Sequence, residues 1–241
     1  MAEPVCGVQS MKKAVIFDLD NTLYDYDAAD KPATKALAEK GSELLGVPVA
    51  EFSMYYEAAK TAVKARHARR AEAHNRMLFC QHVVELLGKS PLPYALELYE
   101  TYWDVFIENM EPYDGVVDFM KALKEKGLRI AVCTDMMTRV QYRKLRKMGM
   151  AGYIDCIVTS EEARCEKPNA VLFQMTLDKL KVLTQEAVFI GDNRRRDVQG
   201  ALWNAIQPIW FVADRDYEPE EGIFTVKSYR DPRLAEFFEL S

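Results

Sequence analysis

Four consecutive apolar residues, 14–17, stand directly before an acidic stretch, 18–22, that reads Asp-Leu-Asp-Asn-Thr. Two of the four are β-branched, which is typical of a strand buried on both faces in the middle of a parallel sheet. Asp18 and Asp20 would then lie at the carboxyl end of that strand, where ligands bind in open α/β sheets. The alternative is a helix cap or a turn, but a cap needs one carboxylate and two close carboxylates repel. The stretch therefore predicts an α/β sheet with a site at this edge.

Helix and strand patterns alternate after Glu111, which indicates βαβ units and a parallel sheet. The expected strands are 128–133, 154–158, 187–190 and 209–212, with a further one at 223–226. The expected helices are 116–126, 138–148, 169–183, 197–204 and 232–240. This order of elements predicts an α/β, Rossmann-like doubly wound parallel sheet.

Residues 25–110 carry only helical patterns. We expect a helix that opens at Asp30-Lys31-Pro32 and ends near Gly46, one long or two consecutive helices between 49 and 88, and an aromatic-rich helix over 94–110. The predicted organisation is an α/β core domain formed by 11–24 and 112–241, with an inserted all-helical domain over 25–111.

Composition restricts the partners and the setting. The net charge of −5 gives no general attraction to nucleic acid or anionic lipid, so we expect neither a nucleic acid polymer nor a membrane as partner. Five cysteines without a Cys-x-x-Cys pair favour neither a disulfide framework nor a zinc site, which predicts a reduced, cytoplasmic setting. No apolar run approaches the ~20 residues that span a bilayer. The first dozen residues lack the features of a signal peptide and are expected to form a poorly ordered leader.

Further polar residues follow the other expected strands. They are Thr134 and Asp135 after one strand, Asp192 and Asp197 in and beyond the turn after another, and Lys167 just before a helix. If the strands are parallel, all of these turns lie at the same edge as the first two acids. The predicted site thus holds several acids, a threonine and a lysine.

This combination of side chains indicates phosphoryl transfer. A small cluster of carboxylates suits a hard cation such as Mg²⁺, which completes its octahedron with water and substrate phosphate. A carboxylate can also attack phosphorus and form an aspartyl-phosphate. Lysine and threonine would offset the charge on the transferred group.

In their order along the chain, these stretches resemble the four motifs of the haloacid dehalogenase superfamily. Residues 18–22 resemble the first motif, Thr134 the second, Lys167 with Pro168 the third, and Gly191 with Asp192 and Asp197 the fourth. The resemblance covers residues 13 to about 212, and the helical insertion is similar to the C1 cap of subfamily I. It implies a phosphatase-type hydrolase of that superfamily.

The resemblance implies roles for four acids. Asp18 would be the nucleophile and a Mg²⁺ ligand. Asp20 would be the general acid that protonates the leaving group and then the base that activates water, with its backbone carbonyl on the metal. Asp192 would ligate Mg²⁺, and Asp197 would ligate it or support the ligand shell.

The resemblance also implies that Thr134 and Lys167 act in catalysis and bind the phosphoryl oxygens. Read from the residues alone, the threonine could merely terminate a strand and the lysine could be solvated. Asp135 is also expected to bind the substrate. It departs from the pattern of the superfamily, because many relatives have asparagine at this position. It adds a negative charge close to a phosphate site, and the orientation of its side chain stays open.

The predicted function is a Mg²⁺-dependent phosphatase that cleaves a small phosphomonoester, such as a sugar phosphate, phosphoglycolate or a nucleoside monophosphate, through an aspartyl-phosphate. Asp20 argues against dehalogenation, since superfamily members that cleave carbon–halogen bonds generally lack an acid there. The alternatives are a phosphoryl mutase of the β-phosphoglucomutase type and a non-catalytic binding module on the same scaffold. A monomer or homodimer is expected.

Basic residues gather in the expected long helix of the insertion. They are Lys64, Arg66, His67, Arg69, Arg70, His74 and Arg76. By helical spacing, His67, Arg70 and His74 would share one face and could bind a distal anion of the substrate. The other interpretation is a hydrated outer face, because Glu57 and Glu72 interleave with the basic residues.

Overall fold

The computed structural model describes residues 11–240, in which six parallel strands form one sheet. The strands are β1 (Ala14–Phe17), β2 (Arg129–Thr134), β3 (Cys156–Thr159), β4 (Ala187–Gly191), β5 (Gln207–Phe211) and β6 (Phe224–Val226). Their order across the sheet is β3-β2-β1-β4-β5-β6. The predicted doubly wound sheet is therefore confirmed, and each expected strand lies within two residues of an observed one. The leader expected over the first dozen residues lies mostly outside the described residues.

Strand β1 occupies the topological switch point of this sheet, since β2 pairs with one of its edges and β4 with the other. Phe17 is in register with Val132 on one side and with Ile190 on the other. All four residues of β1 are fully buried, which accounts for the uninterrupted apolar run. The chain that leaves β1 thus enters the crevice at the carboxyl ends of three neighbouring strands.

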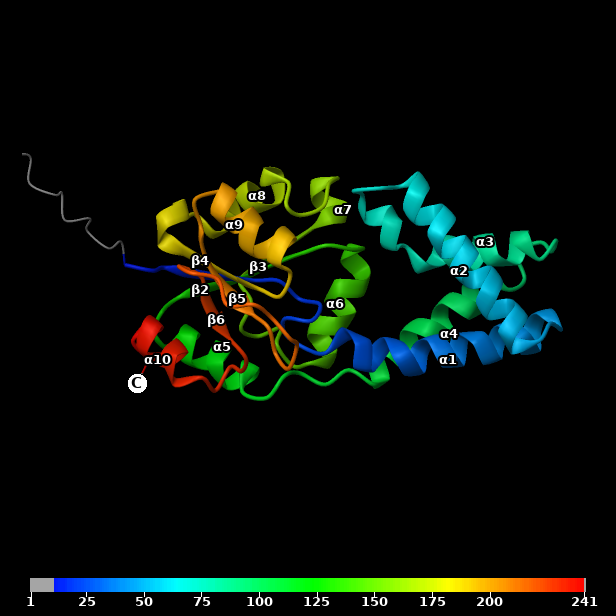
Figure 1. Cartoon of the computed structure of the whole chain (residues 1–241), viewed down its shortest axis with the longest axis horizontal. Helices are drawn as coiled ribbons and strands as arrows, with labels where there is room; N and C mark the ends of the chain where they lie inside the picture. Colours follow the sequence, from blue (N-terminus) through cyan, green and yellow to red (C-terminus); the bar gives the residue numbers. More distant parts are fainter. Residues whose placement is uncertain (1–10, 241) are drawn as a thin grey trace, which may run out of the picture.

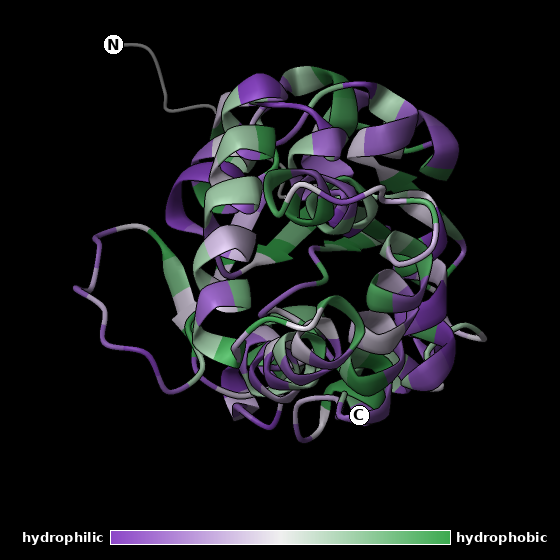
Figure 2. Cartoon of the chain, turned by 90° about the vertical axis from the view of Figure 1, so that its right-hand side faces the viewer, coloured by the Kyte–Doolittle hydropathy of each residue, from purple (hydrophilic) through white to green (hydrophobic). Residues whose placement is uncertain are grey.

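Helices cover both faces of the sheet (Figure 1). They are α5 (Val116–Glu125), α6 (Thr138–Lys147), α7 (Ser160–Ala163), α8 (Ala170–Leu180), α9 (Gln199–Trp203) and α10 (Pro232–Phe238). Val15 and Phe17 point into the core shared with α5, α6 and α10, whereas Ala14 and Ile16 point into the core shared with α8 and α9. The strands at the centre of Figure 2 are mostly hydrophobic, while the helices around them carry hydrophilic residues on their outer sides.

The residues between β1 and α5 are helical, as predicted. They form α1 (Tyr26–Leu45), α2 (Val49–Arg66), a 3₁₀ turn (Ala71–His74), α3 (Arg76–Leu86) and α4 (Ala95–Glu108). These helices extend away from the sheet on the right of Figure 1. The core is thus an α/β sheet with a helical insertion, whereas the domain boundaries 11–24, 25–111 and 112–241 stay a prediction. Within the described residues, no helix is both long and apolar enough to cross a membrane.

Two helix starts differ from the expectation. Helix α1 begins at Tyr26 because Asp25 caps it, accepting a hydrogen bond from the Ala28 amide at 3.0 Å, so Pro32 lies inside the helix. Asp197 does not open a helix; it lies in a π-helical turn (Arg194–Val198) that precedes α9. Such turns are frequent at functional sites.

The basic residues of the insertion do not lie on one long helix. Helix α2 ends at Arg66, Arg69 adopts a left-handed conformation with φ of 65°, and Asn75 caps α3 by accepting from the Met77 amide at 3.0 Å. The expectation that His67, Arg70 and His74 share one helical face is therefore wrong. A local cap and a turn interrupt a stretch that contains neither proline nor glycine.

Close packing of α1 on α2 generates a stability prediction. A Cβ on Gly41 would lie 2.2 Å from the Phe52 ring, so we expect Gly41→Ala to lower the free energy of unfolding by about 1–3 kcal/mol. Urea unfolding measures this change. Gly152→Ala is the control, because a Cβ there has no neighbour within 4 Å. Helix propensity alone favours alanine by about 1 kcal/mol, so a stabilised Gly41→Ala variant would contradict this packing.

Candidate active site

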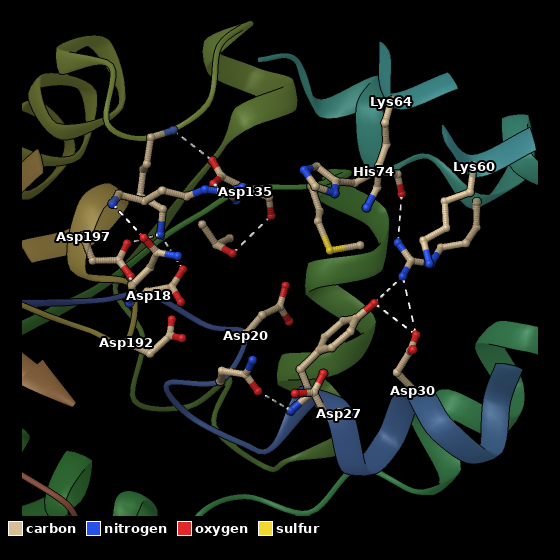
Figure 3. A pocket seen from close by; sticks show the side chains of 18 residues that line it. Asp18, Asp20, Asp27, Asp30, Lys60, Lys64, His74, Asp135, Asp192 and Asp197 are labelled. Atoms are coloured by element: carbon tan, nitrogen blue, oxygen red, sulfur yellow. Dashed lines mark hydrogen bonds and ion pairs between the residues drawn. The ribbon is translucent and has the colours of Figure 1, made fainter. Parts of the chain in front are cut away.

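A cavity of about 410 Å³ lies between the carboxyl edge of the sheet and the helical insertion. All seven residues singled out from the sequence line it: Asp18, Asp20, Thr134, Asp135, Lys167, Asp192 and Asp197. Figure 3 shows the acids of this set on the core side and Lys60, Lys64 and His74 on the side of the insertion, where two further acids of α1, Asp27 and Asp30, also lie. The structure thus brings together residues that are up to 179 positions apart in the chain, from Asp18 to Asp197.

Lys167 is the centre of a buried charge network. Its Nζ donates to Asp18 Oδ1 and, at 3.0 Å, to the Cys133 carbonyl, and it lies 2.8 Å from Asp197 Oδ1. Although burial alone would lower the pKa of this lysine, Asp18 and Asp197 raise it well above its usual value. Lys167 therefore stays charged, and it holds two carboxylates from different elements in one place.

Asp18, Asp192 and Asp197 form a carboxylate cluster. One oxygen of each lies within 4.8 Å of the others, and Asp18 and Asp197 are buried. Burial raises the pKa of all three carboxyl groups, that of Asp192 to about 6. Lys167 and Arg215 contribute two positive charges against three carboxylates, so a cation at this point would reduce the remaining repulsion. Clustered carboxylate oxygens are the donors that Mg²⁺ prefers, and the residues present fit this ion.

Two residues that sequence reasoning missed hold this cluster from the other side. The Thr22 hydroxyl donates to Asp18 Oδ2 at 3.0 Å and lies 3.5 Å from Asp192 Oδ1. Arg215 Nη1 donates to Asp192 Oδ2 at 2.6 Å. Thr22 belongs to the first motif, so the sequence did indicate that it lies near the site. Arg215 follows β5 in a stretch without a recognisable pattern.

The turn after β4 sets the position of Asp197. Asp197 Oδ2 accepts from the Asn193 amide at 2.9 Å, and its side chain occupies the space in which a Cβ of Gly191 would lie. Such a Cβ would be 2.5–2.7 Å from the Asp197 side chain, so only glycine allows this approach.

Asp20 points away from the cluster, toward a second buried lysine. Lys144 Nζ donates to Asp20 Oδ1 at 2.6 Å, the Tyr24 hydroxyl donates to the same carboxylate, and Gln141 Nε2 donates to Oδ2 at 3.3 Å. Burial raises the pKa of Asp20, but Lys144 and these hydrogen bonds lower it by more. The pKa of Asp20 therefore lies below its usual value. Asp20 is therefore held as a carboxylate in this arrangement.

Lys144 and Gln141 were not singled out from the sequence. They lie three positions apart on α6, between apolar residues that pack on the sheet, and both are fully buried. A buried lysine is rare unless it is paired. The sequence pattern of α6 gives no sign that these two polar residues point inward.

Thr134 and Asp135 follow β2, and the structure answers how Asp135 is oriented. Asp135 Oδ1 accepts from the Lys167 amide at 3.0 Å, and Oδ2 lies 3.4 Å from Arg196 Nη1. Its charge is thus partly compensated beside the cavity. Thr134 accepts from Gln141 Nε2 at 2.8 Å.

Comparison with known proteins shows which family this arrangement represents. Residues 12–203 match the family described as haloacid dehalogenase-like hydrolase. The chain belongs to this family, and the resemblance inferred from the four motifs is confirmed.

Two curated relatives and one solved structure illustrate the match. The chain is 33% identical over 214 residues to a ribulose-1,5-bisphosphate 5-phosphatase of Halopiger xanaduensis, covering 88% of this chain and 90% of the relative. It is 28% identical over 198 residues to a glyceraldehyde 3-phosphate phosphatase of Methanopyrus kandleri, covering 79% and 80%. The crystal structure of a HAD phosphatase from Thermococcus onnurineus superposes with a TM-score of 0.75 at 21% identity, covering 93% and 97%, which confirms the fold.

The close approach of Gly191 to Asp197 can be tested by substitution. In Gly191→Ala, the new methyl group would displace Asp197 and loosen its contact with Lys167. We expect the free energy of unfolding to fall by about 1–3 kcal/mol, the usual cost of overpacking, and hydrolytic activity to fall with it. Chemical denaturation and activity assays measure both, again beside Gly152→Ala. Wild-type stability and activity in Gly191→Ala would contradict the assigned role of this glycine.

Proposed function

We propose that the protein is a Mg²⁺-dependent phosphatase that hydrolyses a small phosphomonoester through an aspartyl-phosphate on Asp18. The observation that supports this most directly is the buried carboxylate of Asp18, which lies between Lys167 and Thr22 at the carboxyl end of β1. A nucleophilic carboxylate needs this kind of fixed position beside a cation that offsets the charge of the incoming phosphoryl group.

The first step transfers the phosphoryl group to the enzyme. Asp18 attacks phosphorus, the ester P–O bond breaks, and the leaving oxygen takes a proton from Asp20. Thr134 and Lys167 bind the phosphoryl oxygens. Because an anion raises the pKa of a nearby carboxyl group, bound substrate favours the protonated form of Asp20 that this step requires.

The second step releases phosphate. Asp20, now a carboxylate, takes a proton from a water molecule as that water attacks phosphorus, and the bond to Asp18 breaks. The hydrogen bonds that Lys144 and Tyr24 donate to Asp20 favour this charged form. One residue thus serves as acid and then as base.

Asp18, Asp192 and Asp197, with the backbone carbonyl of Asp20, would hold Mg²⁺. When bound, this ion supplies positive charge against the transferred phosphoryl group. The support is the geometry and donor type of the cluster.

The proposed substrate is a small phosphate ester. A cavity of about 410 Å³ under a helical insertion accommodates a molecule of sugar-phosphate size, and both curated relatives are named for sugar phosphates, one of them a bisphosphate. The reaction is proposed to take place in the cytoplasm, which the free cysteines 80, 133, 156 and 165 support. A monomer or homodimer remains the expectation.

The nucleophile is tested by Asp18→Asn. Its loss should reduce phosphate release by at least about a thousandfold, since removal of a covalent nucleophile costs most of the rate. Asp118→Asn, the same exchange on the exposed surface of α5, is the control. Phosphate release from a panel of phosphomonoesters, measured with Mg²⁺ and with a chelator, gives the result. Wild-type rates in Asp18→Asn would remove the assignment, and retention of the phosphoryl group in a sugar product would favour the mutase.

The acid–base role predicts a different effect for Asp20→Asn. Phosphate release should slow by roughly 10²–10⁴-fold, the usual contribution of general acid–base catalysis. The loss should be smaller for an ester with a good leaving group, such as p-nitrophenyl phosphate, because that oxygen needs no proton to leave. Equal losses for good and poor leaving groups would contradict the acid role.

A further inference from the structure

The wall of the cavity that faces the acidic cluster carries lysines of the helical insertion. Lys60 and Lys64 lie four positions apart on α2, one turn above the other, and both line the cavity together with His74 (Figure 3). Their sequence neighbours Arg66, His67, Arg69 and Arg70 do not line it. The structure therefore divides the basic segment into residues that line the site, namely the two lysines, His74 and Arg76, and a group that does not.

Lys64 has no anionic partner in the described part of the chain. Within residues 11–240 it makes neither an ion pair nor a hydrogen bond. Partial burial lowers its pKa, and the charges of Lys60, Arg76 and Arg196, which line the same cavity, lower it further, although Glu57 raises it in part. Lys60 pairs with Glu57 at 2.9 Å, and exposed pairs of this kind contribute little to stability. Like charges held together in this way favour the binding of an anion.

Within residues 11–240, none of the acids that line the cavity forms an ion pair with Lys60 or Lys64. Asp30 accepts from the Tyr102 hydroxyl and lies 3.6 Å from Arg76, so residues of the insertion already compensate its charge. Asp135 is paired with Arg196. Asp27 lines the cavity from α1 and is exposed to solvent. In Figure 3 both α1 acids lie below Lys60 and Lys64.

We propose that Lys60 and Lys64 bind a second anionic group of the substrate, a phosphoryl or a carboxylate group, at the end remote from the ester that is cleaved. This inference rests on the proposed phosphatase function and specifies its substrate class. The preferred esters are short molecules with an anion at each end, one beside Asp18 and one beside Lys64. A substrate of this kind would bridge the core and the insertion, whereas a simple monoester would leave Lys64 without a partner.

Matched pairs of esters test the inference. Fructose 1,6-bisphosphate is compared with fructose 6-phosphate for a second phosphoryl group, and 3-phosphoglycerate with glycerol 3-phosphate for a carboxylate. In at least one pair, we expect the wild-type kcat/KM to be higher for the ester with two anionic groups. The pair that shows this preference identifies the second anion. In Lys60→Ala/Lys64→Ala this preference should fall roughly tenfold, mainly through KM, as lost charge-assisted hydrogen bonds predict.

Controls separate this effect from a general loss of charge or fold. Arg66→Ala removes a cation from the same helix outside the cavity and should keep the wild-type preference. Lys64→Gln should reproduce much of the loss while retaining the length of the side chain. Added salt should narrow the preference in wild type, because partly exposed lysines are screened. An unchanged preference in the double variant, or an equal loss in Arg66→Ala, would overturn the proposal.

Binding measurements keep the inference separate from the proposed function. If wild type releases no phosphate from any ester, the phosphatase proposal fails, but the lysines can still be tested. Calorimetric titration of Asp18→Asn with fructose 1,6-bisphosphate and with 3-phosphoglycerate should show a Kd that rises roughly tenfold when Lys60 and Lys64 are replaced by alanine. A Kd unaffected by these replacements, or no binding of either ligand, would contradict the distal anion site.

Discussion

The site depends on the ion pairs that Lys167 makes with Asp18 and Asp197. All three side chains are buried, and each charge would be costly in this environment without the others. Lys167 comes from the loop before α8, Asp18 from the end of β1, and Asp197 from the turn after β4. One lysine therefore fixes the relative position of three chain segments. All three side chains line the cavity.

The topology of the sheet explains why these segments meet. β1 lies between β2 and β4, so the loops that follow these three strands open on one crevice. The helical insertion begins directly after the first acidic motif, so the cavity wall that it forms lies opposite the same crevice. A lid attached at this point can close over a substrate and exclude water without disturbing the sheet.

A second ion pair, between buried Lys144 and partly buried Asp20, links the sheet to the insertion. Lys144 Nζ lies 5.4–5.6 Å from the ring centroids of Tyr26, Trp103 and Phe106, which belong to α1 and α4. The lysine that holds Asp20 is thus enclosed partly by aromatic rings of the insertion. The geometry at Asp20 therefore depends on how the insertion packs against α6.

Sequence reasoning went furthest where one strand pattern ends in a polar motif. Asp18, Thr134 and Asp192 could be placed at one edge because parallel strands order their ends regardless of distance along the chain. Side chains on helix faces and in irregular loops could not be placed in this way. Lys144 lies on an amphipathic helix, and nothing in the local sequence indicates that it is buried. Two consecutive helices over 49–88 were one of the two expectations, but the position of the break after Arg66 was not predicted, since an Asn75 cap and a left-handed Arg69 carry weak signals.

The central claim, that Asp18 carries the phosphoryl group, can be tested by trapping the intermediate. The enzyme would be mixed with a ³²P-labelled substrate and Mg²⁺, quenched in acid within one turnover and digested, and the label located by mass spectrometry. The account predicts acid-stable label on the peptic peptide that contains Asp18, and none in Asp18→Asn. Rapid phosphate release without label on that peptide would contradict a covalent mechanism at Asp18.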